Sequence, residues 1–255
     1  MNYDILKVKI TNRCNRDCCF CVFNSINTDG DLSFEKYKII IEKLKKIQFK
    51  KFHINGGEPL IHPQFVEMTK YAKEAFPNVK MVLGTNAILL YNTDIINFVS
   101  DYYEEICIGC DLEHKNIEYV ERAVPQILHR NNHIKIIINS IIEYTNSDFL
   151  ERLDSLKERL RTPIILVKNN VYHVKEGKPI NQLTNLCINN LSNNLLIQEN
   201  GQCYRCFNCE VPADREFNIF DSDFDTKVQQ RNMKHYKYCA WCKLYKAKNE
   251  SEIFE

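Results

Sequence analysis

Strand-like and helix-like segments alternate over the first 170 residues, and this alternation restricts the fold more than any other feature of the sequence. From Ser33 to Gln48, for example, apolar residues recur every three or four positions, as on one face of a helix, and Ser33 stands at the N-cap position. Strands that alternate with helices form parallel sheets with right-handed crossovers. The predicted strands cover 5–11, 52–55, 79–83, 106–110, 134–138 and 164–167, and the predicted helices cover 33–48, 63–76, 94–102, 117–130 and 149–160. Pro125 is expected to kink or stop the fourth helix.

Composition describes an ordinary globular protein. The chain has 255 residues, of which 44% are hydrophobic and 26% charged, enough for one large domain with a small appendage. Its net charge of +1, with both signs interspersed, predicts neither nucleic acid nor a membrane as partner. No targeting segment and no apolar run of membrane-spanning length is apparent, so we expect a cytoplasmic protein. Its twelve cysteines are then expected to be reduced metal ligands rather than disulfides.

Three cysteines follow the first predicted strand in a single loop. Cys14, Cys18 and Cys21 are spaced closely enough to surround one metal centre. A structural zinc site normally has four ligands, and Cys19, adjacent to Cys18, would strain a tetrahedron, so we interpret Cys19 as a bystander. Three thiolates with one open position suit a four-iron cluster with an exchangeable ligand on the fourth iron. The spacing favours the cluster, with zinc as the alternative.

The second predicted strand ends in Gly56-Gly57-Glu58-Pro59, a glycine pair where the main chain can turn tightly and approach a ligand. A strand ending in Cys-x-x-x-Cys-x-x-Cys, then a helix, then a strand ending in Gly-Gly-Glu-Pro resembles the radical S-adenosylmethionine (SAM) superfamily. The resemblance implies a partial (β/α)6, TIM-like barrel in an α/β fold. It also implies a [4Fe–4S] cluster and SAM as cofactors, and a reductant such as flavodoxin or ferredoxin as partner.

The resemblance implies cluster-binding and SAM-binding roles for individual residues. Cys14, Cys18 and Cys21 would hold the cluster, and the Gly56–Pro59 segment (Gly56, Gly57, Glu58 and Pro59) would bind the methionyl part of SAM. Phe20 stands where the family often has an aromatic residue beside the adenine. In the family, the cluster donates an electron that cleaves SAM to methionine and a 5′-deoxyadenosyl radical, which abstracts a substrate hydrogen.

Polar residues follow the other predicted strands, at the edge where barrel enzymes build their sites. Thr85-Asn86-Ala87 resembles the family's Thr-Asn-Gly, with alanine in place of glycine. Asp111 and Asn139 match positions that approach the ribose and carboxylate of SAM in this family, and each could equally cap a loop. Cys107 and Cys110 are expected to be buried apolar residues of a strand.

The sequence changes after residue 170 to a polar, Asn-rich tail with six of the twelve cysteines. Residues 195–204 are predicted to form a hairpin that turns at Asn200-Gly201. The tail resembles the auxiliary-cluster extension of the SPASM and twitch subgroups, which would place a second [4Fe–4S] cluster on Cys187, Cys206, Cys239 and Cys242. Cys203 or Cys209 could replace Cys206 or hold a further cluster, and a zinc ribbon is the alternative. We therefore expect a barrel over 1–170 and an auxiliary-cluster domain over 171–255.

An auxiliary cluster could accept an electron from a substrate radical, so the first functional hypothesis is oxidation or epimerisation of a small polar, carbohydrate-like metabolite. It rests on family analogy. The second hypothesis is maturation of a ribosomal peptide, although the cluster motif starts at residue 14, without the leader-binding domain that many maturases carry. A non-catalytic iron–sulfur or zinc-binding protein is the third, and the Gly-Gly-Glu-Pro motif argues against it. No catalytic residue is assigned.

Overall fold

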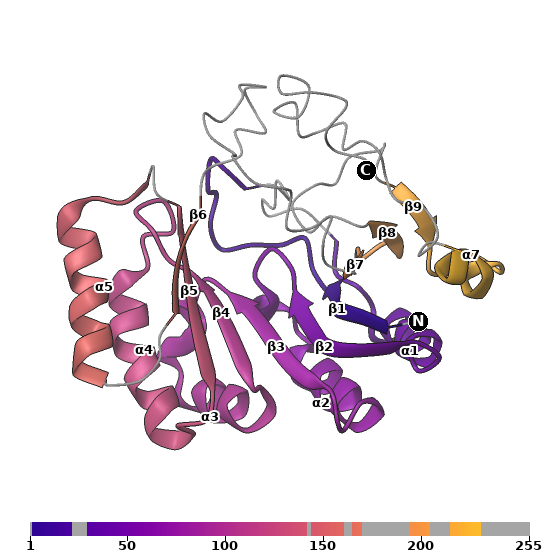
Figure 1. The fold of residues 1–255 in the computed structure, drawn as a ribbon, viewed down its shortest axis with the longest axis horizontal. Helices are drawn as coiled ribbons and strands as arrows, with labels where there is room; N and C mark the ends of the chain where they lie inside the picture. The colour runs from indigo at the N-terminus through magenta and orange to yellow at the C-terminus, as the bar shows by residue number, and fades with distance from the viewer. Residues whose placement is uncertain are drawn as a thin grey trace, which may run out of the picture.

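The computed structural model describes residues 2–21, 30–141, 144–160, 165–169, 194–204 and 215–230. The nine strands in these ranges form one sheet with the order β6-β5-β4-β3-β2-β1-β7-β8-β9 (Figure 1). The strands are β1 (Asn2–Lys9), β2 (Gln48–Asn55), β3 (Lys80–Thr85), β4 (Glu105–Gly109), β5 (Lys135–Ile141), β6 (Ile165–Asn169), β7 (Asn194–Ile197), β8 (Gln202–Tyr204) and β9 (Arg215–Asn218). The α-helices are α1 (Phe34–Leu44), α2 (Phe65–Ala75), α3 (Thr93–Tyr102), α4 (Ile117–Arg130), α5 (Ser147–Leu160) and α7 (Phe224–Gln230).

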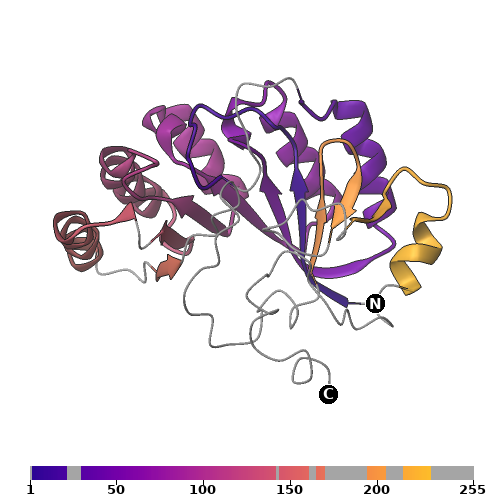
Figure 2. The ribbon, with the colours of Figure 1, turned by 90° about the horizontal axis from the view of Figure 1, so that it is seen from above.

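Strands β1 to β6 run parallel, each paired with the next in sequence. Helices α1 to α5 lie together on the convex side of the curved sheet (Figure 2). Alternate strand residues such as Leu6, Val8, Phe52 and Ile54 are fully buried in the core, as expected where a strand face packs against helices. None of the described helices is both long and apolar enough to span a lipid bilayer.

The predicted order of six parallel strands and five helices is confirmed, and the α/β fold is consistent with a partial barrel. The first strand covers 2–9 where 5–11 was predicted, and the fifth covers 135–141 where 134–138 was predicted. The boundary between α1 and β2 was also misplaced: α1 ends at Leu44 and β2 already begins at Gln48, because β2 pairs with β1 along its whole length, from Asn2↔Gln48 to Lys9↔Asn55. Ser33 caps α1, since its side chain accepts from the Lys36 N–H. Pro125 lies inside α4 and does not stop it, since the helix covers the predicted range, 117–130; a kink at Pro125 stays a prediction.

The C-terminal segments continue the same sheet. Strand β7 pairs in parallel with β1, on the side opposite to β2, and β8 and β9 follow in antiparallel order. The predicted hairpin at Asn200-Gly201 is confirmed, and Gly201 has the positive φ of 83° that glycine permits. The division at residue 170 and the auxiliary-cluster domain stay predictions, because Cys187, Cys206, Cys209, Cys239 and Cys242 lie outside the described residues.

Candidate active site

The loop that carries Cys14, Cys18 and Cys21, called the cysteine loop below, packs against the end of β2 through main-chain hydrogen bonds. The N–H of Gly57 donates to Thr11 O and that of Glu58 donates to Arg13 O, both at 2.8 Å. A Cβ on Gly57 would lie 2.2 Å from Arg13 O, so only glycine fits there. The glycine that was expected to approach a ligand is therefore also required for the chain's own packing.

The cysteine loop is also tied down by a charged contact. Arg13 donates to both oxygens of Asp31, from Nε at 3.0 Å and from Nη2 at 2.6 Å. Thr11 Oγ1 donates to Asp31 Oδ1 at 2.6 Å, and these hydrogen bonds lower the pKa of the Asp31 carboxyl despite its partial burial. Asp31 thus anchors the start of the loop, a role that its position before α1 did not reveal.

Cys14, Cys18 and Cys21 are free thiols, with Cys18 buried and the other two half-buried. Burial raises the pKa of Cys14 to about 11 and that of Cys18 to about 12, and repulsion by Glu58 or Asp111 and by the other loop thiols adds to the rise. The negative charges of the three thiolates would therefore repel one another. Within the described parts of the chain, no three His, Cys, Asp or Glu side chains are gathered closely enough for a single metal ion.

Glu58 is completely buried between β2 and β3, and three donors hold its carboxylate. Oε1 accepts from Leu60 N at 3.1 Å and from Thr85 Oγ1 at 2.8 Å, and Oε2 accepts from Asn86 N at 2.7 Å. Burial nevertheless raises the pKa of Glu58 to about 7, because the loss of solvent outweighs these hydrogen bonds. Pro59, also buried, begins a single 3₁₀ turn directly after it.

The turn after β3 connects Glu58 to the cysteine loop. Asn86 Nδ2 donates to Asn15 Oδ1 at 2.7 Å and lies 3.8 Å from Cys14 Sγ. Ala87 has a left-handed conformation, with φ 61° and ψ 0°, where the related Thr-Asn-Gly pattern has glycine. The tight turn therefore forms despite the alanine, with some backbone strain.

Asp111 is fully buried at the end of β4 and holds the turn that follows it. Its Oδ1 accepts from the main-chain N–H groups of Glu113 and His114 and from His114 Nδ1 at 2.9 Å, while Oδ2 has no hydrogen-bond partner among the described residues. Phe20 packs against the rings of His114 and Tyr144, at 5.4 and 5.3 Å between centroids.

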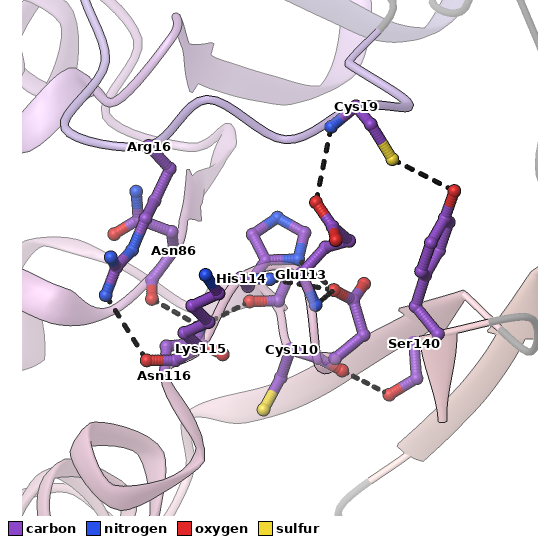
Figure 3. Close-up of polar contacts among 12 residues, drawn as sticks. Arg16, Cys19, Asn86, Cys110, Glu113, His114, Lys115, Asn116 and Ser140 are labelled. Carbon is purple, nitrogen blue, oxygen red and sulfur yellow. Dashed lines mark hydrogen bonds and ion pairs between the residues drawn. The ribbon is translucent and has the colours of Figure 1, made fainter. Parts of the chain in front are cut away.

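The β4–α4 turn meets the cysteine loop at two further points. The Cys19 thiol contacts Tyr144, with Sγ 2.9 Å from Tyr144 Oη, and the Cys19 N–H donates to Glu113 Oε2 at 3.4 Å (Figure 3). Arg16 donates to Lys115 O at 3.2 Å. The cysteine loop thus spans the ends of β2, β4 and β5.

Three further residues named from the sequence, Asn139, Cys107 and Cys110, lie on or next to β4 and β5. Asn139 lies on β5 beside Gly109, and its carbonyl accepts from Cys110 N at 2.9 Å. Cys110 is fully buried as expected, but Cys107 is only part-buried, beside Glu105, so its interpretation as an apolar core residue was incomplete.

Sequence reasoning missed Asn116, which is fully buried before α4. Its Nδ2 donates to Asn86 O and to Gly109 O, both at 2.6 Å (Figure 3). An asparagine before a predicted helix indicates a helix cap. Nothing in the sequence distinguishes a capping asparagine from one that binds the carbonyls of two strand ends.

The residues present suit a bound cofactor with an amino group and hydroxyl groups. The buried carboxyl groups of Glu58 and Asp111 lie close enough to Cys14 and Cys18 for their charges to raise the pKa of these thiols, and Oδ2 of Asp111 has no hydrogen-bond partner among the described residues. Thiolates are the usual ligands of iron–sulfur clusters, so the donor set fits such a cluster.

Comparisons with known proteins agree with this geometry. GTP 3',8-cyclase from Clostridium perfringens (strain SM101 / Type A) is 25% identical over 201 residues, which cover 71% of this chain and 59% of the relative. The mycofactocin maturase MftC of Mycobacterium tuberculosis (strain CDC 1551 / Oshkosh) is 31% identical over 104 residues, or 40% of this chain and 26% of that protein. This chain thus spans less than two thirds of either relative.

The structure of native anSMEcpe with bound AdoMet and Kp18Cys peptide has the same fold, with a TM-score of 0.67 at 12% identity, covering 92% of this chain and 83% of that one. The family model of the radical SAM superfamily matches residues 8–172, which include the cysteine loop, the Gly-Gly-Glu-Pro segment, the last two residues of β1 and strands β2 to β6. The chain belongs to the radical SAM superfamily.

Proposed function

We propose that this protein is a radical SAM enzyme in which Cys14, Cys18 and Cys21 hold a [4Fe–4S] cluster. The observation that carries the proposal is the buried Glu58 carboxylate, held by three donors beside the free thiol of Cys14. When bound, the reduced cluster and SAM supply a 5′-deoxyadenosyl radical that abstracts a substrate hydrogen. Flavodoxin or ferredoxin is the class of protein that would supply the electron, in the cytoplasm.

Glu58 is the residue that we assign to the amino group of SAM. Its three donors fix the carboxylate, and a cationic amine beside it would favour the ionised form of a group whose pKa is about 7. Gly56 and Gly57 let the main chain pack closely against Thr11 and Arg13 beside it. The free Oδ2 of Asp111 can accept a ribose hydroxyl. Phe20 would lie beside the adenine, and Asn86 and Asn139 would complete the cofactor-binding set.

The substrate that we propose is polar. Lys7, His53, Val82 and Glu105 lie in one row across the sheet, related by the register of β1 to β4. Three of these four residues are polar, whereas barrel interiors are ordinarily filled by branched apolar residues. Burial and the nearby charges of Lys7 and Lys51 lower the pKa of His53 well below its ordinary value, so its imidazole is neutral at pH 7. Oxidation or epimerisation of a small polar metabolite, with an auxiliary cluster on the tail cysteines, is our first assignment of the reaction.

Peptide maturation is the second candidate. It is favoured by the identity of 31% to a mycofactocin maturase over 104 residues and by the peptide in the anSMEcpe structure. The two assignments differ in what the enzyme should modify. Incubation with SAM, reductant and either a precursor peptide or candidate metabolites, followed by mass spectrometry, separates them, because dehydrogenation removes two hydrogens and epimerisation in D₂O adds one deuterium.

The test of the enzyme class is SAM cleavage itself. With a reconstituted cluster, SAM and dithionite, wild-type protein should form 5′-deoxyadenosine even without substrate. Cys18→Ser should abolish this activity, because a cluster ligand is lost, whereas Cys19→Ser, which alters the adjacent thiol, should keep most of it. No 5′-deoxyadenosine from wild-type protein with a full cluster would exclude the proposed function.

A further inference from the structure

The side chain of Asn116 makes an unusual pair of contacts. It occupies the N-cap position of α4 but makes no capping hydrogen bond to the helix. Instead Nδ2 donates to the carbonyls of Asn86 and Gly109, both at 2.6 Å, from a side chain with no exposed surface. Its Oδ1 is buried without a hydrogen-bond partner in the described structure. A buried amide that gives up the cap and leaves an acceptor unpaired acts at some cost in stability.

Those two carbonyls belong to neighbouring strand ends. Gly109 ends β4, and Asn86 is the first residue after β3. Asn116 therefore ties the turn after β3 to the end of β4, and Figure 3 labels Asn116 and Asn86. Because Asn116 holds the carbonyl of Asn86, the position of Asn86 is fixed relative to the edge where the proposed cofactors would bind.

Asn86 in turn contacts both parts of the proposed site. Its main-chain N–H donates to Glu58 Oε2 at 2.7 Å, and its side chain reaches Asn15 and the Cys14 thiol. The carbonyl that Asn116 holds belongs to the peptide bond between Asn86 and Ala87, and Ala87 has a strained, left-handed conformation with φ 61°. Strained backbone persists only where surrounding contacts hold it, and the Asn116 bond is one such contact.

We infer that Asn116 is a positioning residue for SAM binding, acting through Asn86 on the Glu58 carboxylate. The inference rests on the proposed function. The hydrogen bonds of Asn116 in the described part of the chain go to Asn86 and Gly109 and not to Cys14, Cys18 or Cys21, so its loss should leave the cluster in place. It should instead misplace the carboxylate that receives the SAM amine. A purely structural asparagine would lower stability without changing SAM binding.

The same helix provides a matched control. Asn131, at the C-cap of α4, also donates from Nδ2 to a main-chain carbonyl, that of Ser100, at 3.0 Å. This contact lies at the opposite end of α4 from the site. Asn131→Ala therefore removes the same kind of hydrogen bond without touching the turn after β3.

The experiment compares Asn116→Ala, Asn116→Ser and Asn131→Ala with wild-type protein after anaerobic reconstitution. Iron content, thermal unfolding, the EPR spectrum of the reduced cluster with and without SAM, and the KM for SAM in 5′-deoxyadenosine formation are measured for each. For Asn116→Ala we expect the KM for SAM to rise on the order of tenfold or more, with unchanged iron content and an unchanged EPR spectrum without SAM. Asn116→Ser keeps one donor and should be intermediate.

Asn131→Ala should lower the unfolding temperature and leave the KM for SAM within about twofold of wild type. A wild-type KM in Asn116→Ala, or an equal rise in Asn131→Ala, overturns the positioning role while leaving the proposed function intact. If Asn116→Ala does not fold, Asn116→Ser decides by the same criterion. No 5′-deoxyadenosine from wild-type protein overturns the proposed function, and this inference with it.

Discussion

The main-chain N–H of Asn86 donates to Oε2 of Glu58 at 2.7 Å, across the ends of two neighbouring strands. Glu58 keeps a pKa of about 7, against an ordinary value of 4.5, although Thr85 and Leu60 donate to it as well. A buried carboxyl that is this close to half-ionised at neutral pH makes both stability and cofactor binding sensitive to pH.

The first prediction concerns that sensitivity. Between about pH 4.5 and 7 the folded protein holds a proton on Glu58 that the unfolded chain has released, so the stabilisation is complete below this window and is lost as the pH rises through 7. We expect the free energy of unfolding of iron-free protein to fall by about 3 kcal/mol across the window because of this group. Urea unfolding at several pH values should show a flatter dependence for Glu58→Gln. Glu35→Gln, an exposed position on α1, should keep the wild-type slope.

Gly57 and Gly84 offer a matched pair of substitutions. A Cβ on Gly57 would meet main-chain atoms of Arg13 at 2.2 Å, whereas a Cβ on Gly84 would meet the side-chain ends of Asn55 and His53, at 2.6 and 2.8 Å. Gly57→Ala should cost about 3 kcal/mol of stability and most of the bound iron, since the cysteine loop must move. Gly84→Ala should cost about 1 kcal/mol, because those side chains can turn aside. Equal losses in urea unfolding and iron content would contradict this explanation.

The auxiliary cluster is tested by counting metal. We expect anaerobically reconstituted wild-type protein to bind about eight irons, as two four-iron clusters. Cys242→Ser should reduce the count to about four and keep 5′-deoxyadenosine formation, while Cys18→Ser should abolish that activity. About four irons with stoichiometric zinc in the wild-type protein would show that the tail holds a zinc site instead.

Lys43 connects α1 to the C-terminal segments. Its Nζ donates to Ile219 O at 2.6 Å and to Asp221 O at 3.0 Å, and it lies 5.4 Å from the centre of the Phe224 ring. Lys43→Met should cost about 1–2 kcal/mol and speed hydrogen exchange in β9 and α7. Lys46→Met removes only an exposed ion pair with Asp225 and should cost less than about 0.5 kcal/mol. If the two variants exchange alike, Lys43 does not hold this segment in place.

The sequence predicted the parallel part of the fold because each segment carried its own periodicity. Helix α4 has the predicted bounds, 117–130, even though Pro125 lies within it. The start of β2 was misplaced because Gln48 to Lys51 has few apolar residues, and only its pairing with β1 shows it to be a strand. Pairing between distant segments is also why the contact of β7 with β1 was not foreseen.

The candidate site divides in a similar way. Cys14, Cys18, Glu58 and Asp111 were recognisable because motifs or strand ends mark them. Asn116 was not, because its role depends on two carbonyls, 30 and 7 residues away, that only the folded chain brings to it. Residues that act through the main chain leave no pattern in side-chain type.

Strand β7 has a consequence for how this protein could be shortened. It covers the side of β1 that β2 leaves free, pairing Ile5 to Val8 with Asn194 to Ile197. A chain cut after the sixth strand would present the N–H and C=O groups of β1 as an open edge, a template for association with other chains. Strand β7, residues 194–197, therefore protects this edge of β1 from association with other chains, and a truncated barrel should precipitate unless another strand replaces it.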